Sequence, residues 1–135
     1  MEGNSLDKPH KRLVVWQRSI ELVREIYQVT ARFPAEERYG LTAQMRRAAV
    51  SIVSNIAEGA ARQGTAEFLQ FAHTALGSLS ELDSQLEISR TLGFLNIEDF
   101  KRINDRMDEV DRLLLGLRNY LRRKLKASKA GKSRH

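Results

Sequence analysis

The sequence predicts an all-α protein, and three observations support this. The chain of 135 residues is 41% hydrophobic and 30% charged, which is ordinary for a helical domain. It holds only two prolines and lacks the long alternation of apolar and polar residues that is typical of strands. Its apolar residues recur instead at helical spacing in four segments. This length fits one domain with a single core.

The first helix is predicted from about Leu13 to Arg32. One stripe of it carries Trp16, Ile20, Val23 and Tyr27, with Leu22 and Ile26 beside them. The helix ends before Pro34, because the residue that precedes a proline is pushed out of the helical region. The spacing assigns Trp16 and Tyr27, together with Phe68 of a later helix, to the core and not to base stacking.

The second helix, predicted from about Thr42 to Arg62, is apolar or small-sided around most of its circumference. Its polar side chains gather within an arc of about 100°: Gln44, Arg47, Ser51, Ser54, Asn55, Glu58 and Arg62. Such a helix must be covered from more than one direction, so we expect a subunit interface here. The polar stripe can be buried there only as a complete hydrogen-bond network.

Two carboxylates, Glu58 and Glu81, belong to this expected network. Apolar residues surround them on their helices, and their candidate partners are Arg46, Arg47 and Arg62. The members we predict are Arg47, Ser51, Asn55, Glu58, Ser78 and Glu81. Two interpretations remain open. The network is buried and fixes helix register or subunit orientation, or it is a polar site that lines a channel or a groove between subunits.

The third and fourth helices carry coiled-coil-like seams, in which apolar residues alternate steps of three and four. The third helix begins at a cap on Thr65 and stops at Gly93. Its seam consists of Phe68, Ala72, Ala75, Leu79, Leu82 and Leu86. Asn96 caps the fourth helix. The seam of that helix consists of Phe100, Ile103, Met107, Val110, Leu114, Leu117 and Leu121.

The connections between these helices are short, which favours antiparallel neighbours. We therefore predict an antiparallel up-down-up-down four-helix bundle over residues 13–121. A flexible segment over residues 1–12 precedes the bundle, and a basic tail over residues 122–135 follows it. Beyond Lys126 the tail carries no large apolar side chain and is expected to be disordered.

The net charge of +6 is concentrated at the C-terminal end. Residues 118–135 hold eight Lys and Arg and no acid, whereas residues 1–117 hold 15 bases and 17 acids. The eight bases are Arg118, Arg122, Arg123, Lys124, Lys126, Lys129, Lys132 and Arg134. The helix dipole accounts for about two or three bases at a helix C-terminus, but not for eight. A basic run of this kind is typical of a nucleic-acid-binding arm or of a solubilising tail.

Catalytic and metal sites are not expected. The chain has no Cys, which excludes disulfides, thiolate metal ligands and cysteine nucleophiles. A di-iron centre needs Glu-x-x-His pairs, but the residue three positions before His73 is Gln70. Gly59 and Gly64 have the spacing of a phosphate-binding loop but lack the lysine and hydroxyl that should follow, and the serines lack a nearby histidine base. We expect no enzyme activity, no cofactor and no metal.

The N-terminal residues are charged where a secretion signal is apolar. No segment approaches about 18 uninterrupted apolar residues, the length that a membrane-spanning helix needs. We therefore expect a cytoplasmic protein without a membrane partner.

Several segments together resemble one known family. They are LVVWQ from Leu13, FP from Phe33, YGL from Tyr39, QMRRAAVSI from Gln44, NIAEG from Asn55, GSLSEL from Gly77 and LGFL from Leu92. Over about residues 13–121 the chain resembles the four-helix-bundle proteins encoded in intervening sequences of bacterial 23S rRNA genes. The resemblance implies the bundle and a ring-shaped homopentamer. It extends at a distance to the accessory protein of diversity-generating retroelements, a basic pentamer that binds nucleic acid and a reverse transcriptase.

Two functions from different classes follow. The first is a non-catalytic, sequence-nonspecific RNA or DNA binder that uses the basic tail and acts on ribosomal RNA or beside a nucleic-acid enzyme. The second is a protein-interaction scaffold whose ring grooves hold a partner protein, with the tail serving solubility. Binding to a generic duplex that weakens with salt distinguishes the first from the second, because phosphate contacts release counterions.

Overall fold

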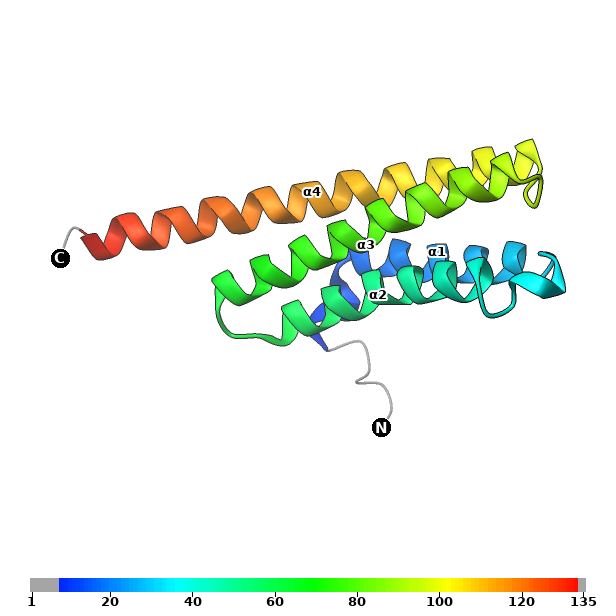
Figure 1. Cartoon of the computed structure of the whole chain (residues 1–135). Helices are drawn as coiled ribbons and strands as arrows, with labels where there is room; N and C mark the ends of the chain where they lie inside the picture. Colours follow the sequence, from blue (N-terminus) through cyan, green and yellow to red (C-terminus); the bar gives the residue numbers. More distant parts are fainter. Residues whose placement is uncertain (1–7, 134–135) are drawn as a thin grey trace.

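Four α-helices account for most of residues 8–133, the part of the chain that the computed structural model describes (Figure 1). They are α1 (Val14–Thr30), α2 (Leu41–Ala61), α3 (Thr65–Thr91) and α4 (Ile97–Ser133). Two short 3-10 helices are also present, η2 (Pro9–Arg12) before α1 and η3 (Ala35–Glu37) before α2. No strand occurs among these residues. The prediction of an all-α chain with four helices is confirmed.

Each of the four helices packs against two others. α1 contacts α2 and α4, and α3 contacts the same two helices, so that α1 and α3 lie on a diagonal. Figure 1 shows the α1–α2 and α3–α4 connections at one end of the molecule and the α2–α3 connection at the other. The C-terminal part of α4 projects beyond the end that carries the α2–α3 connection.

The core lies between the four helices and is almost entirely apolar. Its fully buried large side chains include Leu22, Ile26, Met45, Ile52, Ile56, Leu82, Leu86, Ile103, Val110 and Leu114. The seams predicted for the third and fourth helices face this core. Their Phe68, Phe100 and Leu117 are only partly buried because they lie toward its edges.

The core-facing stripe of α1 differs from the prediction. Val15, Leu22 and Val29 are buried, whereas Ile20 and Tyr27 are 41% and 42% exposed. Both stripes of α1 carry apolar residues, so helical periodicity alone does not decide which one faces inward. The helix α1 contacts α2 on one side and α4 on the other, and the stripe between these two contacts forms the core.

The segments that flank the bundle also differ from the prediction. Residues 1–7, most of the predicted flexible segment, lie outside the described residues. Pro9–Arg12 forms η2, which packs against α1 and α2, and the ring of His10 lies 5.2 Å from that of Trp16. At the other end disorder was expected beyond Lys126, but α4 continues to Ser133. This segment has no proline, and extension of an existing helix avoids the cost of nucleation.

Close approach of α2 to α3 depends on Gly59. A Cβ atom at this position would lie 2.6 Å from Cδ1 of Phe68 and 2.9 Å from Cβ of Phe71. Real Cβ atoms do not approach other carbon atoms so closely, and Phe71 Cβ is fixed to the backbone of α3. The absence of a side chain at Gly59 therefore lets the two helices meet just before their connection.

Ion pairs join α1 to α4 along their contact. Glu25 has a side chain that is only 7% exposed, and its carboxylate lies 3.2 Å from Nε of Arg102 and 2.8 Å from Nη2 of Arg106. The other side of the Arg106 guanidinium reaches Glu21, with Nη1 3.0 Å from Oε1. Because the carboxylate of Glu25 has lost most of its water, these charge-assisted contacts are needed to keep it in place.

A second ion-pair cluster lies at the start of α4. Asp99 accepts hydrogen bonds from Arg102 Nη1 at 2.7 Å and from Arg32 Nη2 at 2.6 Å. The Arg102 hydrogen bond, with smaller contributions from the charges of both guanidinium groups, lowers the pKa of Asp99 below its usual value. Asp99 therefore stays ionised to a lower pH than an ordinary aspartate, and it holds the chain after α1 against α4.

We expect Gly59→Ala to destabilise the fold by about 1–3 kcal/mol, because the added methyl group overpacks the contact between α2 and α3. Gly77→Ala is the matched control, since a Cβ atom at this helical glycine meets nothing within 4 Å. This control should stabilise the protein by about 0.5–1 kcal/mol. Chemical denaturation measures both, and equal effects of the two variants would show that Gly59 is not a steric constraint.

We expect Glu25→Ala to lower the free energy of unfolding by about 1–3 kcal/mol, because two arginines lose their shared buried acceptor. Glu58→Ala is the control. Its partner Arg62 lies 3.8 Å away, with both side chains about half exposed, and an exposed pair is worth less than about 1 kcal/mol. A loss for Glu58→Ala as large as that for Glu25→Ala would instead indicate that a second subunit covers Glu58.

Candidate nucleic-acid interface

Seven of the eight basic residues singled out in the sequence lie on one continuous helical extension, here called the basic arm (residues 118–133 of α4). Leu121 is the last side chain of α4 that the core buries, and Figure 1 shows the rest of the arm projecting from the bundle. Arg122, Arg123, Lys124, Lys126 and Lys129 are all exposed. The structure describes Lys132 only as part of the helical backbone, and Arg134 lies outside the described residues.

The exposed bases of the arm are close enough to act together. Asn119, Arg122, Arg123 and Lys126 line one shallow groove of about 290 Å³. Arg118, at the root of the arm, donates to Oδ1 of Asn119 from Nε and Nη2 at 3.3 and 3.2 Å. Among the described residues no ion pair involves a base of the arm. These cations are therefore available to an external anion.

The predicted polar network forms in part, at the contact between α2 and α3. The hydroxyl groups of Ser51 and Ser78 lie 2.9 Å apart. Asn55 Nδ2 donates to the carbonyl oxygen of Ser51 at 2.8 Å and to its hydroxyl at 3.1 Å. These three residues link the two helices as the sequence suggests.

The two carboxylates expected in this network are exposed within the single chain. Glu81 accepts a hydrogen bond from Gln85 Nε2 at 3.3 Å, and with Arg47 it lines a groove of about 180 Å³ between α2 and α3. Glu58 does not line this groove, and its ion-pair partner among the described residues is Arg62. The interpretation of this network as buried inside one subunit is therefore wrong, because the polar stripe of α2 lies at the solvent edge of its contact with α3.

A second basic surface, which the sequence analysis missed, lies where α1, η3 and α2 meet. A groove of about 540 Å³ there, here called the tyrosine–arginine groove, is lined by Tyr27, Arg38, Tyr39, Thr42, Ala43, Arg46, Arg47 and Val50. Three of these residues are arginines and none is acidic. Assigning Tyr27 to the core was wrong, because its ring lies on the outward stripe of α1. The one available signal was Tyr39, an aromatic residue placed in a charged connector.

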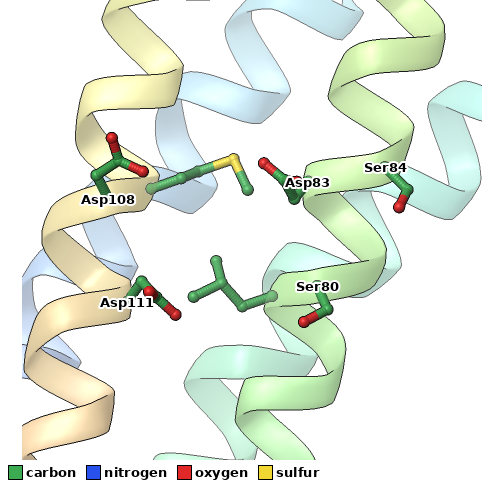
Figure 2. Close-up of a pocket in the computed structure, with 7 residues that line it drawn as sticks. Ser80, Asp83, Ser84, Asp108 and Asp111 are labelled. Carbon is green, nitrogen blue, oxygen red and sulfur yellow. The ribbon is translucent and has the colours of Figure 1, made fainter.

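An acidic groove of about 390 Å³ lies between α3 and α4, away from both basic surfaces. Figure 2 shows Asp83 projecting from α3, and Asp108 and Asp111 projecting from α4, toward the space between the two helices. Within residues 8–133 no cluster of His, Asp and Glu has the arrangement that could hold a metal ion. Carboxylates repel phosphate groups, so this face does not favour a polyanion.

Over the same described range, none of the helices combines the length and the apolar character needed to cross a membrane. No curated protein matches the sequence. The fold is similar to the crystal structure of a protein of unknown function from the S23 ribosomal protein family of Bacteroides thetaiotaomicron. The two share 25% sequence identity with a TM-score of 0.73, over 78% of this chain and 96% of that chain.

Residues 11–116 of this chain match the model of one protein family. This range contains α1, α2, α3 and the first half of α4, and it ends before the basic arm begins. The arm therefore lies outside the matched region. Because the match covers most of the chain, this protein belongs to the 23S rRNA-intervening sequence protein family.

Proposed function

We propose that this protein is a non-catalytic, sequence-nonspecific nucleic-acid-binding protein whose basic arm contacts backbone phosphates. The single observation that carries this proposal is the projection of the arm from the bundle with its bases exposed and free of carboxylate partners. The family name refers to 23S rRNA, so RNA is the ligand to test, beginning with ribosomal RNA. We propose no catalytic step, because the described residues offer no nucleophile paired with a base.

The helical state of the arm strengthens the argument from its charge. Favourable interaction with the helix dipole is confined to the last turn of a helix and is worth about 0.3–1 kcal/mol for each cation. Because α4 continues to Ser133, Arg118, Arg122 and Arg123 lie several turns before that end. The dipole therefore does not account for these bases. A solubilising role does not require cations that are aligned along one face of a helix. Basic side chains one helical turn apart match the repeated phosphate groups of a nucleic acid.

We further propose that antiparallel bundles of this kind assemble into a homopentameric ring, as the family resemblance implies. Exposed apolar side chains outside the tyrosine–arginine groove, Ile20 on α1 and Ile88 on α3 among them, supply surface that assembly would cover. If five arms meet one nucleic acid, each contact after the first becomes intramolecular, so weak single-arm contacts add up to tight binding.

The alternative is a protein-interaction scaffold. The observation that favours it is the groove between α2 and α3, where Arg47 and Glu81 present opposite charges beside the Ser51 and Ser78 hydroxyls. Mixed charge of this kind suits a polar peptide better than a polyanion. The arm then serves solubility, and duplex binding is absent at physiological salt.

We expect replacement of Arg122, Arg123 and Lys126 by Gln to weaken duplex binding and to reduce the slope of log K against log salt. The slope should fall by about 0.9 for each lost phosphate contact, or about 3 if all three bases contact phosphate. Fluorescence anisotropy over a salt series measures both quantities. Replacing the exposed bundle residues Arg24, Lys101 and Arg112 by Gln removes the same charge and is the control. If both triple variants behave alike, the arm is not the binding element.

We expect light scattering to give a mass near 77 kDa, since five copies of a 15.4-kDa chain make up the proposed ring. Ile20→Lys and Ile88→Lys place charges on exposed apolar positions of α1 and α3 and should lower this mass. Val14→Lys changes another exposed apolar residue of α1, about 120° around the helix from Ile20, and as the control it should leave the mass unchanged. A monodisperse monomer at micromolar concentration would rule out the ring.

A further inference from the structure

We propose that the tyrosine–arginine groove binds an unpaired nucleobase of a single-stranded nucleic acid, which stacks on Tyr39 while the arginines hold the flanking phosphates. The proposal shares its ligand class with the proposed function but places the contact on the bundle and not on the arm. The groove adds a preference for single strands, which a row of cations alone does not provide.

The exposure of Tyr39 is the first observation that supports this site. Its ring is 87% exposed, in the connector between η3 and α2. The guanidinium carbon of Arg38 lies 5.7 Å from the centre of this ring. A flat aromatic surface beside a cation is the arrangement on which bases stack in single-strand-binding proteins. Tyr39 fills no core position that would account for it.

Arg46 is held in place before any ligand arrives. Its guanidinium carbon lies 4.4 Å from the centre of the Tyr27 ring. Its Nε donates to Thr30 Oγ1 at 2.9 Å, and its Nη2 donates to the carbonyl oxygen of Tyr27 at 3.2 Å. These contacts leave Nη1 to donate to a phosphate. A guanidinium that is fixed in advance loses little conformational freedom on binding.

The charge around the groove also favours a phosphate backbone. Arg38, Arg46 and Arg47 line it, and no carboxylate does. Glu36 and Glu37 lie on η3, and Glu81 lines the separate groove between α2 and α3 together with Arg47. Of these, Glu37 accepts a hydrogen bond from the backbone N–H of Leu41 at 3.1 Å and so caps the start of α2, while Glu36 does not line the groove.

The groove favours an unpaired base over a base in a duplex. Its volume of about 540 Å³ falls within the range of sites for small organic groups. A base inside a duplex has both faces covered by its neighbours and cannot reach Tyr39, whereas an unpaired base can turn outward and stack. Figure 1 places the α1–α2 connection at the opposite end of the bundle from the projecting arm, so the two surfaces can be altered separately.

The test compares three labelled ligands of equal length, each of about 15 nucleotides. They are an unpaired RNA, an abasic strand with the same phosphates, and a duplex. Fluorescence anisotropy gives the affinity of four proteins for each ligand. They are the wild type, Tyr39→Ala, Tyr39→Phe and the arm variant, in which Gln replaces Arg122, Arg123 and Lys126. Tyr39→Ala should weaken binding of the unpaired RNA by about 5- to 150-fold, the usual effect of losing one stacked base. Binding of the abasic strand and of the duplex should not change, Tyr39→Phe should keep wild-type affinity, and the arm variant should bind all three ligands more weakly.

The outcomes separate the two proposals. If the wild type binds none of the ligands, the proposed function fails and the groove site fails with it. If the wild type binds all three but Tyr39→Ala leaves the ratio of RNA to abasic affinity unchanged, only the groove site is overturned. A lower oligomeric mass for Tyr39→Ala in light scattering would also overturn it, because the groove would then be a contact between copies of this chain.

Discussion

The close packing of α2 on α3 is the constraint on which the rest of the bundle depends. Ala48 puts a small buried side chain beside the contact between α2 and α3, and Gly59 has no side chain where Phe68 and Phe71 of α3 come closest. The Ser51–Ser78 hydrogen bond then joins them midway. The bundle is completed by α1, which packs on α2, and by α4, which packs on α3. Charged residues join α1 and α4 where these two helices meet.

The contacts between α1 and α4 are of a different kind. Glu25 is nearly buried between Arg102 and Arg106, and Arg18 reaches Glu109 at 3.1 Å. Buried carboxylates of this type contribute little net stability against an apolar alternative, but they are costly to leave without partners. A shift of α4 along α1 would take Arg102 and Arg106 away from Glu25, so these ion pairs disfavour other registers. Because the arm is the continuation of α4, the observed register also fixes where the arm emerges.

The sequence predicts the helices well because their ends carry local signals. Pro34 ends the first helical region. Gly93 has a φ of +80°, a conformation suited to glycine at a helix end. Asn96 accepts a hydrogen bond from the backbone N–H of Asp99 at 2.8 Å, as expected of a cap. The cap predicted on Thr65 is wrong, because this residue already lies within α3 and Gly64 precedes it.

Sites that join different elements could not be predicted in the same way. The ion pairs of Glu25 depend on which face of α1 meets α4, and two apolar stripes made that choice ambiguous. The tyrosine–arginine groove brings a residue of α1, Tyr27, to a residue of a connector, Tyr39, and nothing local marks the pair. The basic arm was identified from its charge, but its conformation depends on the anchoring of α4 by Leu114 and Leu121 in the core.

The helical state of the arm has a mechanical consequence. A disordered tail explores many directions and must lose that freedom when it binds, whereas a helix continuous with the core behaves as a stiff lever. With a rise of about 1.5 Å per residue, the twelve residues after Leu121 reach about 18 Å from the bundle. Under the proposed function, a nucleic-acid strand held on this lever would be kept at a set distance and angle from the body of the protein, and tension on the strand would act as torque on the contact between α4 and α1.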